Sequence, residues 1–331
     1  MSTEDDMPDG GSSGSRRTAV LEPAERKPPR QAGDRIFSGI SLAAGVSILV
    51  ALGGVFVFLF IQGYGALSVD ESVFLGSGAT TFAGYVLPLI YGTAMAAVLA
   101  LIIATPFAIG IALFISHYAP KRLAGTISYV MDLLAAVPSV VFGLWGGRYL
   151  AEYMQEPIRW LADNMSWLPF FSDENVSQSG RTMLTAGLVL AVMVLPISAA
   201  ICREVFSRTP RLHEEAALAL GATRWEMIRY AVFPYSRSGV VSGIMLGLGR
   251  ALGETMAVAM VLSSGFVITL NTIGSESPRT IAANIAVNYK ESGPAQQSVL
   301  IATGLVLFAF TFAVNFLARW IAGRSERRMA R

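Results

Sequence analysis

Long apolar runs divide this chain of 331 residues and constrain its fold more than any other feature. Six stretches supply the ~20 apolar residues that a helix needs to cross the hydrocarbon core of a bilayer. They cover about residues 36–62, 88–116, 124–147, 183–202, 238–262 and 297–320. Because lipid cannot bond to backbone polar groups, each run should be helical, and unbroken runs exclude a β-barrel. The sequence therefore predicts an all-α membrane protein with six transmembrane helices.

The composition agrees with this class. Hydrophobic residues make up 53% of the chain and charged residues 15%, against ~25% charged residues in soluble domains. Three prolines, Pro106, Pro138 and Pro196, fall inside the apolar runs. Proline lacks the backbone N–H that a helix interior requires, so we expect kinks or local unwinding at these positions.

The distribution of Lys and Arg predicts the orientation of the chain, because basic residues stay on the cytosolic side of a membrane. Of the 25 basic residues, 19 lie in the two terminal segments, the last counted from Arg319 at the end of the sixth run, and in the second and fourth connections. Five lie in the other connections, and Arg250 alone lies in the interior of a run. Both termini are therefore predicted to be cytosolic. Topology accounts for the basic residues, so the net charge of +2 does not indicate nucleic-acid binding.

We expect five segments along the chain: a disordered cytosolic tail (1–35), a first transmembrane helix (36–62), an external loop (63–87), a core (88–320) and a basic cytosolic tail (321–331). The tail over 1–35 has few apolar residues, which is typical of disorder. The first run is too long for a cleavable signal and should be retained. A second external loop, about 148–182, contains Trp160 and Trp167. Such aromatics favour the membrane interface, and a docking surface for an external protein is the alternative.

The connection over 203–237 is too long for a simple turn and too polar to enter lipid. Pro210 suits the first turn of a helix, and Glu214 and Glu215 suit its positive N-terminal end. Gly221 is a natural C-terminal stop. A second short helix is predicted over 223–232, closed by Pro234 before the fifth run. Two short helices around a glycine turn would form a compact cytosolic projection.

The same connection resembles the EAA motif of the permeases of binding-protein-dependent ATP-binding-cassette (ABC) importers. That motif reads EAA, three residues, Gly, nine residues, then I-x-L-P, and the matching residues here are Glu215, Ala216, Ala217, Gly221 and Pro234. The resemblance implies that these residues couple the chain to a separate ATPase. The usual Ile and Leu are replaced by Ala231 and Phe233. An amphipathic helix lying on the membrane is the alternative interpretation.

None of the three lysines follows a glycine, so the chain lacks the Gly-Lys-Ser/Thr of a phosphate-binding loop. We therefore expect this chain to bind no cofactor and to be no enzyme, with ATP and Mg²⁺ used by the partner ATPase. No catalytic residue or metal site is predicted. His117 and His213 lack Cys or acidic neighbours at metal-ligand spacing. Asp132, in the third run, is expected to be a buried carboxylate bonded to a neighbouring helix.

Two charged residues, Arg250 and Glu254, interrupt the fifth run. A central Arg costs at least ~2.5–3.5 kcal/mol on insertion scales, so both should face the protein interior. Their spacing of four residues predicts a pair on one helix face. Gly239, Gly243 and Gly247 share that face and predict close helix packing. The alternative to a functional role is an ion pair that only holds helices together.

Three segments resemble the phosphate importer permeases, and among them the PstC subunits rather than their PstA partners. These segments are 87–93 with the stretch that follows it, 133–146, and LGLGRALGETMAVAMV at 246–261. The resemblance implies a type I ABC importer permease architecture like MetI and the maltose permease, in a bacterial inner membrane. It also implies four partners besides lipid: a PstA-like second permease, a PstB-like ATPase dimer, a PstS-like external binding protein, and phosphate. Arg250 and Glu254 match the residues that are implicated in transport in that family.

The chemistry of the two charges suits phosphate. A guanidinium offers paired donors to two phosphate oxygens, and a carboxylate can accept a hydrogen bond from P–OH. We expect Arg250 to attract the anion and Glu254 to prevent binding that is too tight for release. The alternatives are an importer of sulfate, molybdate or an organic nutrient, an ion-gradient-driven secondary transporter with Glu254 as its proton site, and a structural scaffold.

Overall fold

The computed structural model describes residues 32–68, 74 and 76–329. Most of the predicted tail over 1–35 lies outside these residues, and its last four begin the first helix, α1 (Ala32–Tyr64). The chain forms two units, Met1–Leu52 and Gly53–Arg331, so α1 belongs partly to each. The part of α1 in the first unit exposes apolar side chains, Phe37 and Leu42 among them. A helix with apolar residues on all sides is typical of a segment surrounded by lipid.

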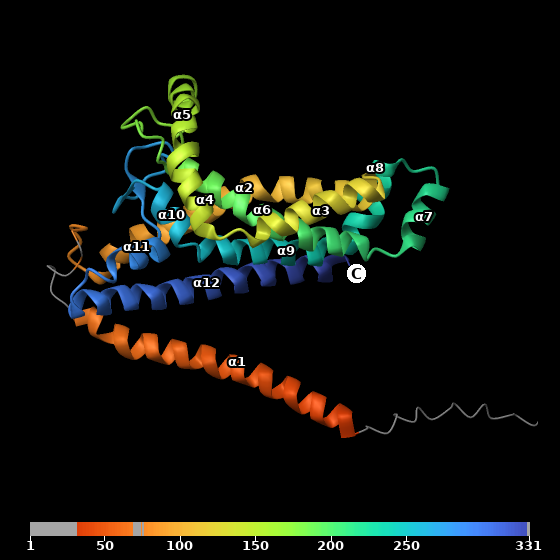
Figure 1. Ribbon diagram of the computed structural model, residues 1–331, viewed down its shortest axis with the longest axis horizontal. Helices are drawn as coiled ribbons and strands as arrows, with labels where there is room; N and C mark the ends of the chain where they lie inside the picture. The colour runs from red at the N-terminus through yellow and green to blue at the C-terminus, as the bar shows by residue number, and fades with distance from the viewer. Residues whose placement is uncertain (1–31, 69–73, 75, 330–331) are drawn as a thin grey trace, which may run out of the picture. The chain divides into compact units, whose positions relative to one another are not determined.

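The second unit is built around four long helices that run side by side (Figure 1): α2 (Phe82–Leu113), α6 (Met183–Ser207), α9 (Phe233–Leu252) and α12 (Pro294–Met329). Small residues allow their close approach. A Cβ at Gly239 of α9 would lie 2.4 Å from Val205 of α6, and one at Gly247 would lie 2.6 Å from Val194. The predicted glycine packing face of the fifth run is thus confirmed, and α6 is the helix that it contacts.

Four helices are long and apolar enough to cross a membrane: Ile36–Tyr64, Phe82–Tyr118, Met183–Ser207 and Pro294–Trp320. A bent pair, Lys121–Ala136 with Ser139–Met165, would make a fifth. The structure therefore describes a helical multi-pass membrane protein. Within the described residues it gives four or five candidate spans rather than the expected six.

The third apolar run is broken rather than continuous. Helix α3 (Lys121–Ala136) ends before Pro138, and α4 (Ser139–Trp145) continues through a wide π-helical turn, η4 (Gly146–Leu150), into α5 (Ala151–Met165). The bend between the two parts is 90°. Val137 takes an extended conformation because proline crowds the residue before it. The break predicted at Pro138 is confirmed, whereas α2 and α6 continue through Pro106 and Pro196.

Two further expectations need correction. Asp132 is exposed on α3, so the prediction of a buried carboxylate there is wrong. Helix α2 begins at Phe82, earlier than residue 88, because the Thr81 side chain accepts a hydrogen bond from the Gly84 N–H and caps it. At the other end α2 runs on through a π-helical turn, η3 (Phe114–Tyr118). Helix α12 continues into the segment 321–331 as far as Met329.

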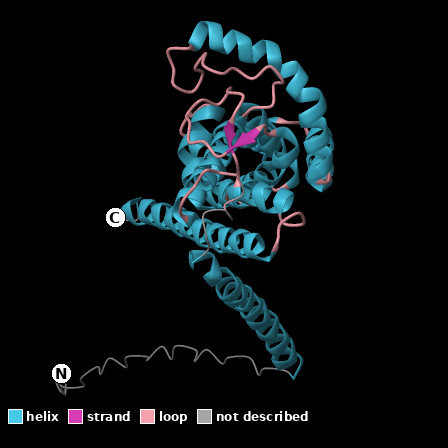
Figure 2. Ribbon diagram, turned by 90° about the vertical axis from the view of Figure 1, so that its left-hand side faces the viewer, coloured by secondary structure: helices cyan, strands magenta, loops and turns pink. Residues whose placement is uncertain are grey.

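The fifth run is also broken, into α9 and a short helix, α10 (Met256–Val261). After α10, two parallel strands, β1 (Ser264–Gly265) and β2 (Ser277–Pro278), precede α11 (Ile281–Asn288). The strands lie over one end of the bundle, as Figure 2 shows. Thr93 of α2 accepts a hydrogen bond from the Ile281 N–H at 3.0 Å and holds the start of α11.

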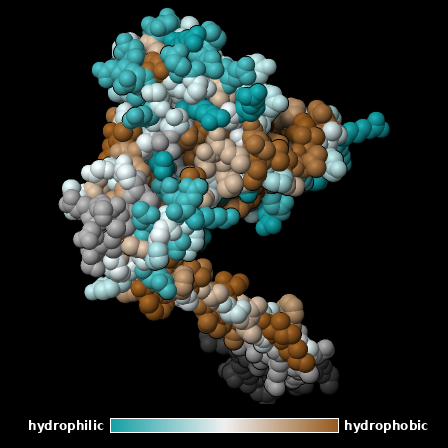
Figure 3. Space-filling model, turned by 60° about the vertical axis from the view of Figure 1, so that its left-hand side comes forward, coloured by the Kyte–Doolittle hydropathy of each residue, from teal (hydrophilic) through white to brown (hydrophobic). Residues whose placement is uncertain are grey.

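The two ends of the bundle differ in character. One end carries α5, α10, α11 and the strands, and the other carries two short helices, α7 (Arg211–Ala219) and α8 (Arg224–Met227), beside the end of α12 (Figure 1). In Figure 3 hydrophilic side chains gather over the end with α5, whereas hydrophobic ones cover the flank of the bundle. The remaining element, η1 (Gly65–Ser68), is a short 3-10 turn after α1.

Candidate transport pathway and coupling site

Arg250 lies in the last turn of α9, where the sequence predicted a charge inside the protein. The residue is partly buried, and its Nε atom is fully buried without a hydrogen bond to any described residue. A buried donor without a partner costs ~1–3 kcal/mol, and more when it is charged. Such a group inside a helical membrane protein is a functional candidate by default, because an anion could satisfy it.

Glu254 does not pair with Arg250, so the predicted ion pair is wrong. Helix α9 ends at Leu252, and the break at Gly253 removes the geometry that brings residues four apart together. The Glu254 side chain is buried, with the residue 9% exposed, and Oε1 accepts the backbone N–H of Ala257 at 3.2 Å. The carboxylate therefore caps the N-terminal end of α10, where negative charge is favourable. An ion pair that only holds helices together is excluded for the same reason.

At the opposite end of the bundle, α7 and α8 form the two-helix projection that the sequence predicted. Helix α7 begins directly after Pro210, and Gly221 has φ +86°, a left-handed conformation that favours glycine. At the start of α8, Thr223 donates its N–H to Glu226 at 2.8 Å and accepts the Glu226 N–H at 3.3 Å. The Thr223 hydroxyl also donates to Oε2 of Glu226 at 2.8 Å. The hydrogen bonds that the Thr223 N–H and hydroxyl donate to this carboxylate lower the pKa of Glu226 from its ordinary value.

The end of the projection differs from the expectation. Helix α8 continues through a π-helical turn, η5 (Ile228–Val232), directly into α9. Pro234 therefore lies in the first turn of α9 instead of closing the projection. The wide turn contains Tyr230, the residue four positions before the proline, which fits the clash of the proline ring with that residue's carbonyl.

Three contacts fix α7 against the bundle. Ala217 packs into a buried cluster that includes Phe206 and Ile228. Glu214 lies 3.5 Å from Nε2 of His117, whose side chain is only 8% exposed. The other ring nitrogen of His117 is 2.7 Å from the Ser116 hydroxyl. His117, for which the sequence indicated no role, thus joins η3, at the end of α2, to α7. The ring of His213 also lies edge-on to that of Tyr235, with centroids 6.0 Å apart.

The opposite face of α7 is open. Glu215 and Ala216 are exposed, and so are large apolar side chains, with Leu212 73% and Leu220 90% exposed. Of the predicted coupling residues, the first two thus face solvent, Ala217 faces the bundle, and Gly221 forms the turn. Exposed leucines at a polar end of a protein are typical of an interaction surface.

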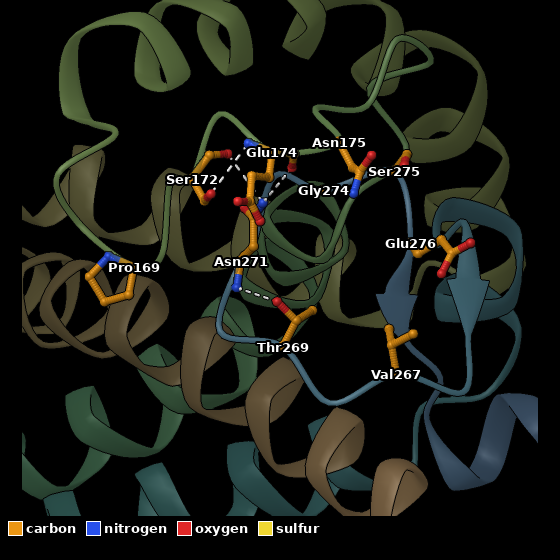
Figure 4. A pocket seen from close by; sticks show the side chains of 10 residues that line it. All are labelled: Pro169, Ser172, Glu174, Asn175, Val267, Thr269, Asn271, Gly274, Ser275 and Glu276. Carbon is orange, nitrogen blue, oxygen red and sulfur yellow. Dashed lines mark hydrogen bonds between the residues drawn. The ribbon is translucent and has the colours of Figure 1, made fainter.

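The end with α5 carries a polar cavity of about 500 Å³ between two loops (Figure 4). Asn271 holds the loops together, since its Nδ2 donates to the Ser172 carbonyl at 3.2 Å and the Glu174 carbonyl at 3.1 Å. Glu174 and Glu276 line the cavity and are exposed. Two carboxylates repel an anion, so this cavity is not suited to phosphate.

Comparisons with known proteins place the chain in a family. Residues 104–331 match the family described as binding-protein-dependent transport system inner membrane component. The chain is 44% identical over 305 residues to phosphate transport system permease protein PstC 2 of Mycobacterium tuberculosis, covering 89% of this chain and 93% of that protein. It is 42% identical over 249 residues to PstC of Haemophilus influenzae, covering 74% and 77% of the two chains.

The fold has a solved counterpart in a bacterial ABC transporter involved in the import of the acidic polysaccharide alginate. The TM-score is 0.53 at 17% identity, covering 88% of this chain and 96% of that chain. This likeness concerns the fold alone. With the matches to permeases over most of its length, the chain belongs to the binding-protein-dependent transport system inner membrane components and, within them, to the PstC permeases of phosphate transport systems.

Proposed function

We propose that this chain is one permease subunit of an ATP-driven phosphate importer in the bacterial cytoplasmic membrane, and forms half of the translocation pathway. The observation that carries the proposal is Arg250, a partly buried guanidinium whose Nε lacks a partner among the described residues. Relatives that are 37–44% identical are named phosphate transport permeases, so an oxyanion is the natural ligand for this group.

Arg250 and Glu254 act on the anion in different ways in this proposal. The guanidinium attracts phosphate and offers it paired donors. The Glu254 carboxylate, fixed on the N-terminal end of α10, keeps a negative charge near the anion and weakens its binding enough for release. Since Glu254 also caps α10, a change in its contacts would alter the position of that short helix.

Partner chains supply the energy for transport. We propose that the open face of α7 with Glu215 inserts into a PstB-like ATPase dimer, which binds ATP and Mg²⁺, while a PstA-like permease completes the pathway. The exposed leucines of α7 support such a contact. A PstS-like binding protein would dock on the rim of the cavity in Figure 4, at the opposite end of the bundle.

The membrane topology follows from the same assignment. We propose six crossings with both termini cytosolic, as in type I importers, with α9 and α10 together as the fifth. The end of α12 lies at the same end of the bundle as α7, which supports a cytosolic C-terminus (Figure 1).

The test is uptake of labelled phosphate into proteoliposomes that contain the chain with the second permease and the ATPase. ATP is enclosed in the compartment that the ATPase faces, and the loaded binding protein is added on the other side. We expect uphill uptake only in the complete system, with Arg250→Ala reducing it about tenfold or more, since a buried charge contact is worth ~1.5–3 kcal/mol. Arg208→Gln is the matched control, because Arg208 is an exposed residue paired with Glu204. Accumulation without nucleotide would favour a gradient-driven transporter, and equal inhibition by sulfate or molybdate a different oxyanion.

A further inference from the structure

Two arginines, Arg148 and Arg181, border a cavity of about 730 Å³ between α4, η4 and α10. Its other walls are mainly apolar and include Trp145, Tyr149 and Met260. Both arginines lie at the end of the bundle opposite α7, and both are exposed, so a ligand can reach them. The sequence showed them only as two basic residues on the external side.

The cavity has a fixed backbone frame, because three glycines leave no room for a side chain. A Cβ at Gly147 would lie 2.6 Å from the Met260 carbonyl, and one at Gly143 would lie 2.9 Å from Cα of Ala257. Helix α4 and the start of η4 therefore lie directly against α10. Gly180, with φ +69°, packs on the Ala151 carbonyl and fixes the residue that follows it, Arg181.

The charge at this cavity is unbalanced. None of the described residues that line it is acidic, and neither guanidinium is ion-paired with a described carboxylate. Among the described residues, the Arg181 guanidinium donates only one long hydrogen bond, 3.5 Å from Nη2 to the Gly147 carbonyl. Nearby Arg159, by contrast, is paired with Glu156 at 3.4 Å. Two like charges beside low-dielectric walls concentrate the field and attract anions.

Helix α10 connects the cavity to Glu254. Glu254 caps the first turn of this helix, and Ala259 and Met260 near its other end line the cavity. Six residues at ~1.5 Å each span about 9 Å. We propose that Arg148 and Arg181 form an outer phosphate site, which receives the anion before it reaches Arg250. This inference rests on the proposed function and adds to it the residues where import begins.

A phosphate oxyanion could also come from a lipid headgroup, since tryptophan and tyrosine are common at the membrane interface. We assign the site to free inorganic phosphate, because a transport pathway needs its ligand to enter and leave. Inorganic phosphate and a lipid headgroup offer the same oxyanion, so the test asks which of the two compounds protects the arginines from chemical modification.

The first arm of the test is direct. The complete complex in dodecyl maltoside is treated with phenylglyoxal, which modifies arginine, and labelling of each site is read by mass spectrometry. We expect inorganic phosphate to slow the labelling of Arg148 and Arg181 several-fold, while an equal ionic strength of chloride does not, and Arg159 is unaffected by either. Protection by phosphatidylglycerol but not by inorganic phosphate would make this a lipid site and overturn the proposal.

The second arm measures transport. In proteoliposomes at limiting loaded binding protein, the double variant R148Q/R181Q should import phosphate about tenfold more slowly while stimulated ATP hydrolysis continues. R159Q removes one charge from the same side and should import at the parental rate. Parental uptake by the double variant would overturn the outer site. If the unmodified complex shows no ATP-dependent phosphate uptake, the proposed function fails, and the labelling arm still reports whether the arginines bind phosphate.

Discussion

At the scale of single residues, the helix break at Gly253 gives Arg250 and Glu254 separate tasks. The sequence predicted both charges inside the protein, because lipid excludes them, and the partly buried Arg250 and the buried Glu254 agree. It predicted a pair because the run was read as one helix. Glycine is common inside membrane helices, so Gly253 alone did not indicate an end. The cap on Ala257 depends on this turn and could not be predicted from spacing.

Substitution of Glu254 separates its two roles. Glu254→Gln keeps an oxygen that can accept the Ala257 N–H, whereas Glu254→Ala leaves the start of α10 without a cap. We therefore expect Glu254→Gln to retain several-fold more phosphate uptake than Glu254→Ala in the reconstituted complex. Equal loss in both variants, with both complexes assembled, would show that charge alone matters and that the cap has no part in transport.

A second residue-scale prediction concerns Glu226 in the capping box with Thr223. Hydrogen bonds from Thr223 lower the pKa of this carboxyl, so their stabilising effect is complete above the ordinary glutamate pKa and disappears as pH falls through the lowered value. We expect Thr223→Val to return the Glu226 pKa toward its ordinary value, followed by NMR of a complex with ¹³C-labelled glutamate carboxyls. An unchanged Glu226 titration in this variant would contradict the role of the Thr223 hydroxyl in the box.

At the scale of elements, local chemistry made α7 and its glycine turn predictable, since start and stop residues lie within the segment itself. The π-helical run into α9 was missed because its signal, Pro234, was read as a terminus. The break after α3 was predicted at Pro138, but its angle of 90° was not. Its angle is set by distant contacts, in particular the close approach of Gly143 to α10.

The contact between His117 and Glu214 predicts how motion of α7 reaches the bundle. His117→Ala should loosen α7, so that ATP hydrolysis continues but several-fold less phosphate is imported per ATP. The exchange His117→Glu with Glu214→His should restore part of this ratio, because the pair is re-formed in reverse. Removing the exposed pair of Arg208 and Glu204 is the control, as surface pairs contribute only ~0–1 kcal/mol. An unchanged ratio in His117→Ala would exclude the contact from coupling.

At the scale of the whole molecule, hydropathy predicted the membrane class and the long helices correctly, because burial in lipid demands long apolar segments. The number of membrane crossings was harder to predict from the sequence. Glycines and Arg250 dilute the apolar character of α9, which is not among the candidate spans, and the bent third run counts as one span or none.

Cysteine labelling tests the orientation. The native Cys202 is fully buried and should not react with a membrane-impermeant maleimide. In a Cys202→Ala background, Leu220→Cys on the α7 side should be labelled only in inside-out vesicles, and Asp173→Cys beside the external cavity only in right-side-out vesicles. Labelling of both positions from the same side would contradict the proposed topology.

The bend at Pro138 has a consequence for everything that follows it in the chain. Each complete crossing reverses the sidedness of later segments, whereas a hairpin that returns to its own leaflet leaves it unchanged. If α3 and α4 traverse the bilayer before α5 turns along its surface, α7 emerges facing the cytosolic nucleotide pool. If α3 and α4 instead returned to the side from which they entered, α7 would emerge facing the outer medium, where no ATPase could reach it.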